Sequence, residues 1–418
     1  MSLRYAVIGL GARSSMYCKF LTSKETDNEL VALLDTNRTR MERAKEVMGL
    51  DLPTYLPHQF EEMVKNENVQ GLVVTSPDYT HDEYIIKGLR LGLRVITEKP
   101  MTTDEYKCKT ILDTVKETGN DCIVTFNYRY SPYRAKLKEL LQEEIIGKIT
   151  MVDFHWYLDT SHGADYFRRW HREASKSGTL LVHKATHHFD LVNWWLAARP
   201  VAVAAFGANS FYNPSTSPYS TRCKTCPRTS ECRFFMNLEK NDHLKALYLD
   251  AEAEDGYFRD RCVFSPEINI WDTETLIVRY DQGQLLSYSL YNYAPYEGYR
   301  IAFVGTKGRI EQEVIEAAYV KTEKGVVRKG IGAVKTMVYP LFAEPYEVPA
   351  EQHTGDHGGG DPRMLRELFA TKQEGNVLHQ QATSFDGAMS ILVGVAARRS
   401  IEGQQIIWIE DLLNPGRR

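Results

Sequence analysis

The sequence predicts an α/β protein with two parts, an N-terminal doubly wound parallel sheet and a C-terminal α/β region with a large, open, mostly antiparallel sheet. Up to about residue 126, strand-like apolar runs alternate with helical patterns, which is typical of a parallel sheet. Beyond residue 127, several strand-like runs follow one another without intervening helices, which favours antiparallel pairing. We therefore predict two domains, 1–126 and 127–418, with a cleft between them.

The N-terminal elements follow from apolar runs of strand length, because parallel strands are buried on both faces. The predicted strands cover Arg4–Leu10, Glu29–Leu34, Val69–Thr75, Arg94–Thr97 and Asp121–Phe126, and the predicted helices cover Ser15–Leu21, the segment from Asp35 to Met48, Phe60–Lys65, Tyr79–Leu91 and Thr103–Thr118. The helices are long enough to cover both faces of such a sheet.

The C-terminal elements are fewer helices and more strands. Helices are predicted at Pro132–Glu143, His183–Leu196, Pro362–Thr371 and Ser384–Ser400, and strands at Thr150–Leu158, Val201–Ala208, Thr273–Tyr280, Leu285–Tyr293, Tyr299–Gly305 and Arg309–Val314. The stretch 212–262 fits no regular pattern and is expected to be an irregular insertion.

Composition indicates a soluble globular protein in the cytoplasm. A hydrophobic content of 43% with 25% charged residues is enough for a large core. The net charge of −4 and the lack of a long basic run argue against a nucleic-acid partner. No apolar stretch approaches the ~20 residues of a membrane span, and no signal-peptide pattern is present.

A glycine-rich turn after the first strand predicts a dinucleotide site. Gly9 allows a tight turn, and Gly11 lets the backbone approach a pyrophosphate at a helix N-terminus. The third small position of this fingerprint is Ser14. Asp35 ends the second strand, where an acid holds the ribose hydroxyls of NAD, while Arg38 leaves NADP open through its 2′-phosphate. A nucleotide fold without a dinucleotide is the alternative.

Glu98-Lys99-Pro100 ends a later strand at the same edge of the predicted sheet. Ligands of doubly wound sheets collect outside the carboxyl ends of the strands. Lys99 is therefore expected to reach a substrate beside a nicotinamide ring, which indicates an oxidoreductase.

The order of these motifs resembles the Gfo/Idh/MocA family, named after glucose–fructose oxidoreductase and inositol dehydrogenase. The motifs are Gly-Leu-Gly at 9–11, Asp35, Thr75-Ser-Pro77 with His81, Glu98-Lys99-Pro100, Asn127-Tyr-Arg129, Gly147-Lys-Ile149, Gly305-Thr-Lys-Gly308 and Ser384-Phe-Asp-Gly387. The resemblance implies a Rossmann domain and NAD(P)-linked chemistry on sugars or cyclitols. It also implies a homodimer or homotetramer formed through the C-terminal sheet. On this basis we expect further cofactor contacts from Arg13, Thr75, Pro77, His81, Glu98 and Lys99.

Oxidation of a secondary alcohol needs a base with a pKa near neutrality, for which histidine is suited. The resemblance implies that His187 is this base and that Asp190 is the acid downstream. The family's aspartate four residues before the base is His183 here, with Lys184 beside it. This change adds positive charge near Lys99, which suits a substrate with a carboxylate or phosphate, or one whose alkoxide is stabilised. In the other interpretation, His183 simply supplies the aspartate's hydrogen bond.

The spacing of histidines and cysteines suggests two candidate metal sites. His183 and His187 are four residues apart, as zinc-binding histidines on one helix face are, and a third ligand could come from the segment 353–361. Separately, Cys223, Cys226, Cys232 and Cys262 bracket the irregular insertion and predict a structural zinc site, with reduced thiols or a disulfide as alternatives.

Arg129 and Trp170 are predicted substrate contacts beside Lys184, because aromatic faces pack on sugar rings and arginine binds hydroxyls or carboxylates. The leading function is an NAD(P)-dependent dehydrogenase or reductase acting on a sugar, sugar acid or cyclitol. A glycoside hydrolase or lyase that uses transient oxidation by NAD is a second function, and a non-catalytic NAD-binding regulator is a third.

Overall fold

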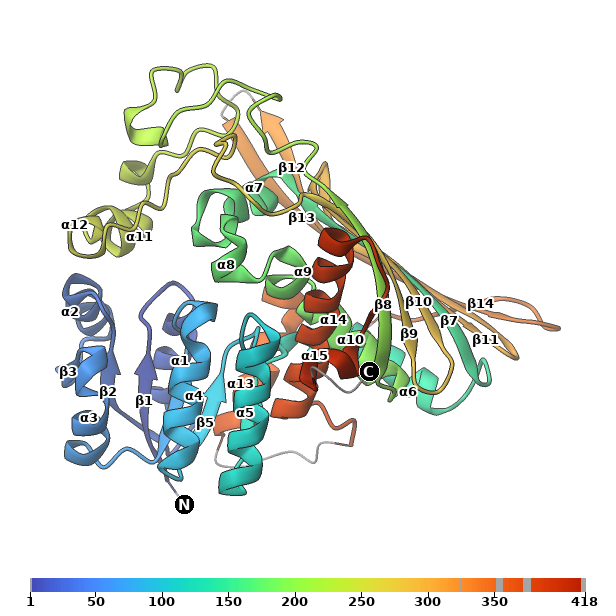
Figure 1. Cartoon of the computed structure of the whole chain (residues 1–418), viewed down its shortest axis with the longest axis horizontal. Helices are drawn as coiled ribbons and strands as arrows, with labels where there is room; N and C mark the ends of the chain where they lie inside the picture. The colour runs from blue at the N-terminus through green and yellow to red at the C-terminus, as the bar shows by residue number, and fades with distance from the viewer. Residues whose placement is uncertain (1, 323–324, 351–355, 371–376, 415–418) are drawn as a thin grey trace.

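The computed structural model describes residues 2–322, 325–350, 356–370 and 377–414. Two sheets lie at opposite sides of the molecule, with the helices α10 (Thr186–Leu196) and α14 (Ser384–Gly403) between them (Figure 1). The first sheet is parallel and the second is mixed but mostly antiparallel, which confirms the predicted α/β fold class.

The N-terminal sheet has the strand order β3-β2-β1-β4-β5-β6 among the described residues. Its strands are β1 (Arg4–Ile8), β2 (Glu29–Leu34), β3 (Thr54–Tyr55), β4 (Gly71–Val74), β5 (Arg94–Thr97) and β6 (Cys122–Val124), and its helices are α1 (Ser14–Leu21), α2 (Arg38–Met48), α3 (Phe60–Asn66), α4 (His81–Arg90) and α5 (Glu105–Thr118). Every residue of β4 is buried, as expected for a central strand with helices on both faces. The carboxyl ends of β1, β2, β4 and β5 meet at one edge of this sheet.

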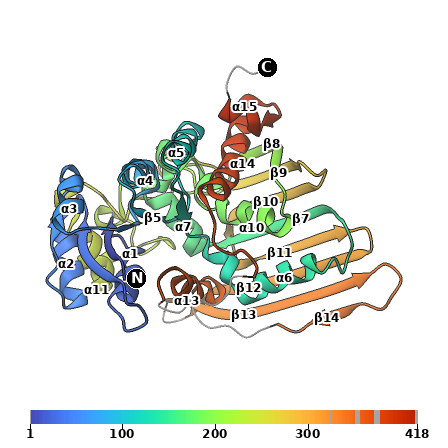
Figure 2. The same ribbon diagram turned by 90° about the horizontal axis from the view of Figure 1, so that it is seen from below.

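The second sheet has the order β14-β13-β12-β11-β7-β10-β9-β8-β15, and its central pair, β7 with β10, is parallel (Figure 2). Its strands are β7 (Ile149–Asp159), β8 (Pro200–Ala208), β9 (Thr273–Tyr280), β10 (Leu285–Ala294), β11 (Tyr296–Gly305), β12 (Gly308–Thr322), β13 (Gly325–Pro340), β14 (Tyr346–Val348) and β15 (Ile407–Trp408). The remaining helices are α6 (Pro132–Gln142), α7 (Thr160–Arg168), α8 (Ala174–Ser177), α9 (Leu180–His183), α11 (Asp242–Leu244), α12 (Glu252–Asp255), α13 (Asp356–Phe369) and α15 (Ile409–Leu413).

The structure differs from the sequence prediction at several elements, and the short helices α7, α8 and α15 are among those that were not predicted. The strands β3, β13, β14 and β15 were not predicted, because two are only two residues long and the others lack a clean apolar alternation. The helix predicted at His183–Leu196 is two helices, α9 and α10, separated at Lys184 and Ala185. The helix predicted at Pro362–Thr371 is observed within α13, and Thr371 lies outside the described residues.

The stretch 212–262 contains only short helical turns, including α11, α12 and the π-helical turn η7 (Lys245–Leu249). It extends away from the second sheet to lie beside α2 of the first, which both views show (Figures 1 and 2).

Across the described ranges, no helix has the length and apolar character needed to cross a membrane.

Helix α14 supports the short helix α9, which ends at His183. The backbone of Gly394 in α14 passes so close to α9 that a β-carbon there would collide with the carbonyl oxygen of Leu181. Gly394 has an ordinary helical conformation, so the constraint is the close approach of the two helices. The position of His183 therefore depends on this contact.

We predict that Gly394→Ala lowers the free energy of unfolding by about 2 kcal/mol, because the added methyl group forces α9 and α14 apart. Gly403→Ala is the matched control in the same helix, since its β-carbon would meet only the flexible side chain of Gln405, at 3.3 Å. Urea unfolding followed by circular dichroism measures both. Equal midpoints for the two variants would contradict this account of the packing.

Candidate active site

The glycine-rich turn has the shape that a dinucleotide requires. Gly9 has φ 84°, and a β-carbon at this position would collide with the backbone of Ser76. At Gly11 the nearest atom to a β-carbon would be the Tyr248 hydroxyl oxygen, 4.0 Å away, so the backbone there is open to a ligand. Ser14 starts α1 and donates from its hydroxyl to the carbonyl oxygen of Gly11 at 2.8 Å.

Asp35 lies at the end of β2, next to this turn. Its carboxylate accepts hydrogen bonds from the backbone N–H groups of Leu10, at 2.5 Å, and Asn37, at 2.8 Å. A carboxylate has room for further donors, so Asp35 can still accept from ribose hydroxyls. Thr75 at the end of β4 fixes the turn by donating to the carbonyl oxygen of Gly9 at 2.5 Å. These residues fit the adenosine and pyrophosphate portions of NAD.

Three other residues that we predicted to contact the cofactor, His81, Pro77 and Arg38, lie in the loops at this edge of the sheet or at the start of α2. Both ring nitrogens of His81 lie 2.8 Å from carbonyl oxygens, those of Pro100 and Ser76, so this buried ring joins two loops of the sheet edge. Pro77 precedes the turn that begins α4, on the same loop as Ser76. The backbone N–H of Arg38 donates to the carboxylate of Glu254 at 2.6 Å.

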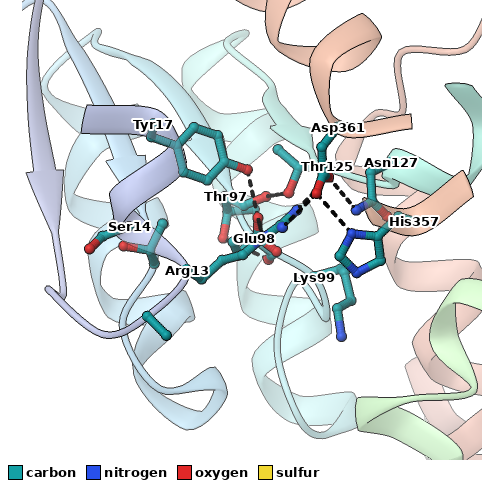
Figure 3. A network of polar contacts seen from close by, with 12 residues as sticks. Arg13, Ser14, Tyr17, Thr97, Glu98, Lys99, Thr125, Asn127, His357 and Asp361 are labelled. Carbon is teal, nitrogen blue, oxygen red and sulfur yellow. Dashed lines mark hydrogen bonds and ion pairs between the residues drawn. The ribbon is translucent and has the colours of Figure 1, made fainter. Parts of the chain in front are cut away.

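Arg13 binds two carboxylates (Figure 3). Its Nε donates to Glu98 at 2.8 Å, and its two terminal nitrogens donate to Asp361 at 3.0 and 2.9 Å. Burial acts to raise the pKa of Glu98, but Arg13 and the Tyr17 hydroxyl, 2.6 Å away, hold that pKa below its usual value. The guanidinium that we predicted to contact the cofactor therefore joins the end of β5 to α13.

The loop that begins α13 adds a histidine that the sequence did not single out as a site residue. His357 has φ 55° and is followed by Gly358 and Gly359, which also have positive φ. Its Nδ1 lies 2.8 Å from Asp361, which also accepts from the Asn127 side chain at 2.6 Å. The run of three glycines was the available signal that this loop adopts a special conformation next to the site.

Lys99 lies beyond this network, and its ammonium donates to the carbonyl oxygen of His183 at 3.2 Å. The side chain is partly exposed. Burial of the ammonium lowers the pKa of Lys99 to about 8, opposed by Asp78 and reinforced by Lys184. Lys99 can therefore change its charge near neutral pH, as a proton-transfer or oxyanion-binding group does.

Asp78 is a second site residue that the sequence reasoning missed. Its carboxylate oxygen lies 2.5 Å from Nδ1 of His183, and both side chains are buried. Burial raises the pKa of Asp78 and lowers that of His183, so burial favours the neutral form of both groups. A carboxylate is thus present beside residue 183 after all, supplied by the loop after β4. An acid at the end of a parallel strand was the signal that could have found it.

His187 is buried against aromatic rings. Its imidazole stacks on Tyr128 with ring centroids 4.2 Å apart, and its Nδ1 has no hydrogen-bond partner within the described structure. Burial lowers the pKa of His187 well below its usual value, and the charges of Lys99 and Lys184 lower it further. The ring is therefore neutral at pH 7 and able to accept a proton from a bound hydroxyl.

Lys184 and Trp170 contact different members of the predicted site. The ammonium of Lys184 donates to the Tyr128 hydroxyl at 3.1 Å and lies 3.9 Å from Glu297. Trp170 is partly exposed, stacks on His171 with centroids 3.7 Å apart and meets His183 edge-on at 5.8 Å. Lys184 therefore orients Tyr128, and Trp170 keeps an accessible ring beside His183.

Arg129 is placed differently from our expectation. Its guanidinium forms two hydrogen bonds with Asp190, at 2.8 and 2.6 Å, and is only 2% exposed. The paired planar geometry satisfies both groups away from water. The structure thus shows Arg129 joining the segment after β6 to α10, where it supports the helix of His187.

The cysteine prediction is not supported. Cys223, Cys226, Cys232 and Cys262 are free thiols that line a single cavity of about 380 Å³ with several phenylalanines. Over the described ranges, no three His, Cys, Asp or Glu side chains are arranged to hold a metal ion. The same finding covers His183 and His187, which lie on separate helices; His353, in the segment considered for a third ligand, is outside the described residues. Spacing along the chain did not reveal that these sulfur atoms spread around a cavity.

Two models of one oxidoreductase family match the chain. The NAD-binding Rossmann fold of that family matches residues 3–126, and its C-terminal alpha/beta domain matches residues 138–410. The fold and the site thus define an oxidoreductase with a dinucleotide-binding domain. The chain belongs to the Gfo/Idh/MocA family, which confirms the resemblance seen in its motifs.

Relatives agree with this assignment. YteT of Bacillus subtilis (strain 168), which carries the name of an oxidoreductase, is 37% identical over 97% of both chains. A scyllo-inositol 2-dehydrogenase (NAD(+)) of the same organism is 25% identical over 49% of this chain and 57% of its own. The crystal structure of scyllo-inositol dehydrogenase from Lactobacillus casei with NAD(H) and scyllo-inositol has a TM-score of 0.64 at 16% identity, covering 98% of this chain and 100% of that one. The last comparison shows a shared fold.

We predict that Asp190→Asn lowers the free energy of unfolding by about 3–5 kcal/mol, because it removes the bidentate charge partner of the buried Arg129 guanidinium and leaves it the partly exposed carboxylate of Asp386, 3.4 Å away. The double variant Arg129→Met/Asp190→Leu should be more stable than Asp190→Asn, since both charges are removed together. Urea unfolding of the three proteins measures this. A double variant less stable than the single one would show that Arg129 has another role.

Proposed function

We propose that this protein is an NAD-dependent dehydrogenase that oxidises a secondary alcohol of a sugar, sugar acid or cyclitol. One observation carries the proposal. Lys99, with its lowered pKa, lies in the same site as the neutral, buried His187. The names of the inositol dehydrogenases among the relatives support the substrate class. The acid at Asp35 supports NAD.

In this proposal a bound nicotinamide supplies the hydride acceptor, and the protein manages the proton. The Lys99 ammonium binds the substrate oxygen and stabilises its developing negative charge. His187, whose buried ring is neutral, takes the hydroxyl proton. Asp78 holds His183, whose carbonyl oxygen in turn accepts from Lys99. The ring of Trp170 offers an apolar face for the substrate.

We further propose that two copies of the chain associate through the outer face of the second sheet. The side chains of Phe206, Ile277 and Met151 on β8, β9 and β7 are 77%, 57% and 37% exposed, respectively. Exposed apolar side chains on neighbouring strands are typical of a subunit interface.

We predict that His187→Ala lowers kcat for alcohol oxidation by about a hundredfold or more, because the proton acceptor is lost. NADH fluorescence with a panel of inositols, sugars and uronic acids identifies the substrate and measures this loss. His58→Ala, an exposed histidine of the N-terminal region, is the control and should retain full activity. NAD binding without NADH production from any compound would contradict the dehydrogenase and favour transient oxidation or a regulator.

The pH dependence should follow Lys99. Its charged form is required, and its pKa is about 8, so kcat/KM should fall as the pH rises through about 8. Burial holds the pKa of His187 well below its usual value, so His187 adds no acid limb near neutral pH. Lys99→Arg keeps the charge and should move the alkaline limb upward, whatever its overall rate. An alkaline limb unchanged in Lys99→Arg would assign that limb to another group.

A further inference from the structure

The irregular insertion reaches the dinucleotide edge of the first sheet. Its segment 247–255, which spans the end of η7 and α12, lies against the start of α2 (Figures 1 and 2). The Asn37 side chain donates to the carbonyl oxygen of Ala251 at 2.9 Å and to the carboxylate of Asp255 at 3.1 Å. The insertion therefore meets the turn that follows Asp35, the residue expected to hold the adenosine ribose.

Glu254 occupies the N-terminus of α2. Its carboxylate accepts from the backbone N–H groups of Arg38, at 2.6 Å, and Thr39, at 3.3 Å, and from the Thr39 hydroxyl at 2.8 Å. Free N–H groups at a helix N-terminus attract anions. In this protein, donors that could receive a phosphate beside the ribose already bind a carboxylate.

Asp255 neutralises the positive charge of Arg40, which could otherwise bind a 2′-phosphate. It pairs with Arg40 at 2.7 Å, and Arg40 also lies 3.7 Å from Asp35. The Arg40 Nε donates to the carbonyl oxygen of Leu247 at 3.1 Å, so the guanidinium is held from several sides. Its remaining neighbour is the ring of Tyr248, with the guanidinium carbon 5.8 Å from the centroid.

The same segment also reaches the glycine-rich turn, because the Tyr248 hydroxyl oxygen lies 4.0 Å from the position that a β-carbon at Gly11 would occupy. The insertion thus extends from the pyrophosphate end of the expected site to its ribose end. Its acids lie at the ribose end, where NAD carries a hydroxyl and NADP carries a phosphate.

We propose that the segment 247–255 selects NAD against NADP, with Glu254 and Asp255 as the specificity-determining residues. The inference rests on the proposed function, in which a dinucleotide binds beside Asp35. A 2′-phosphate, with about two negative charges, would have to displace Glu254 from α2 and would then face Asp255 and Asp35. A ribose hydroxyl meets no such repulsion and can donate to Asp35.

The test is the equilibrium binding of NAD and of NADP to the protein. Titration calorimetry measures both affinities at low salt, where exposed charges act most strongly. The parent protein should bind NADP at least about tenfold more weakly than NAD. Glu254→Gln should strengthen NADP binding by about tenfold and change NAD binding by less than about threefold. Asp250→Asn is the matched control, because Asp250 is an acid of the same segment that pairs only with Lys245 in the described structure.

Several results would overturn the proposal. Equal affinity of the parent protein for both dinucleotides would refute the selectivity but leave the dehydrogenase standing. Binding of neither would refute the proposed function as well. If Glu254→Gln unfolds, Glu254→Ala replaces it, since it also removes the carboxylate and leaves the N–H groups at the start of α2 open to a phosphate. An NADP affinity unchanged in a folded Glu254 variant, or raised equally in Asp250→Asn, would assign the segment a purely structural role.

Discussion

The ion pairs of Arg13 with Glu98 and Asp361 are the contact on which the site depends. One guanidinium binds two carboxylates with low exposure, which come from the end of β5 and from α13. Removing any member would leave a charge uncompensated away from water, at a high cost in free energy. The glycine-rich turn, the strand that carries Lys99 and the His357 loop are therefore held in one arrangement (Figure 3).

The charges around Lys99 have one consequence for chemistry. Burial and, to a smaller extent, two nearby lysines keep the imidazole of His187 neutral, while Asp78 limits the fall in the pKa of Lys99. At neutral pH, His187 can therefore accept a proton and Lys99 can carry a positive charge. Asp78 comes from the first sheet and His183 from α9, so the balance forms only when the two halves of the chain pack together.

The chain combines the motifs of its family with an irregular stretch, 212–262, that contacts the first sheet's helix α2. The motifs Gly9 to Gly11 and Glu98 to Pro100 belong to the part matched by the family's NAD-binding model. The irregular stretch carries the four cysteines, and its Glu254 contacts the start of α2. The cysteines line a cavity among phenylalanines, and the acids contact the nucleotide-binding half.

The sequence by itself determined the fold class, most elements of both sheets and the positions of Gly9, Asp35 and Lys99 at one sheet edge, because local periodicity and turn chemistry specify these features. Only the tertiary structure decided which side chains of the site pair with one another. Asp78 and His183 are 105 residues apart, and Arg13 and Asp361 are 348 apart. Such pairs depend on how the elements pack, and spacing along the chain carries no information about them. For the same reason the cysteine spacing suggested a metal site that the packing does not form.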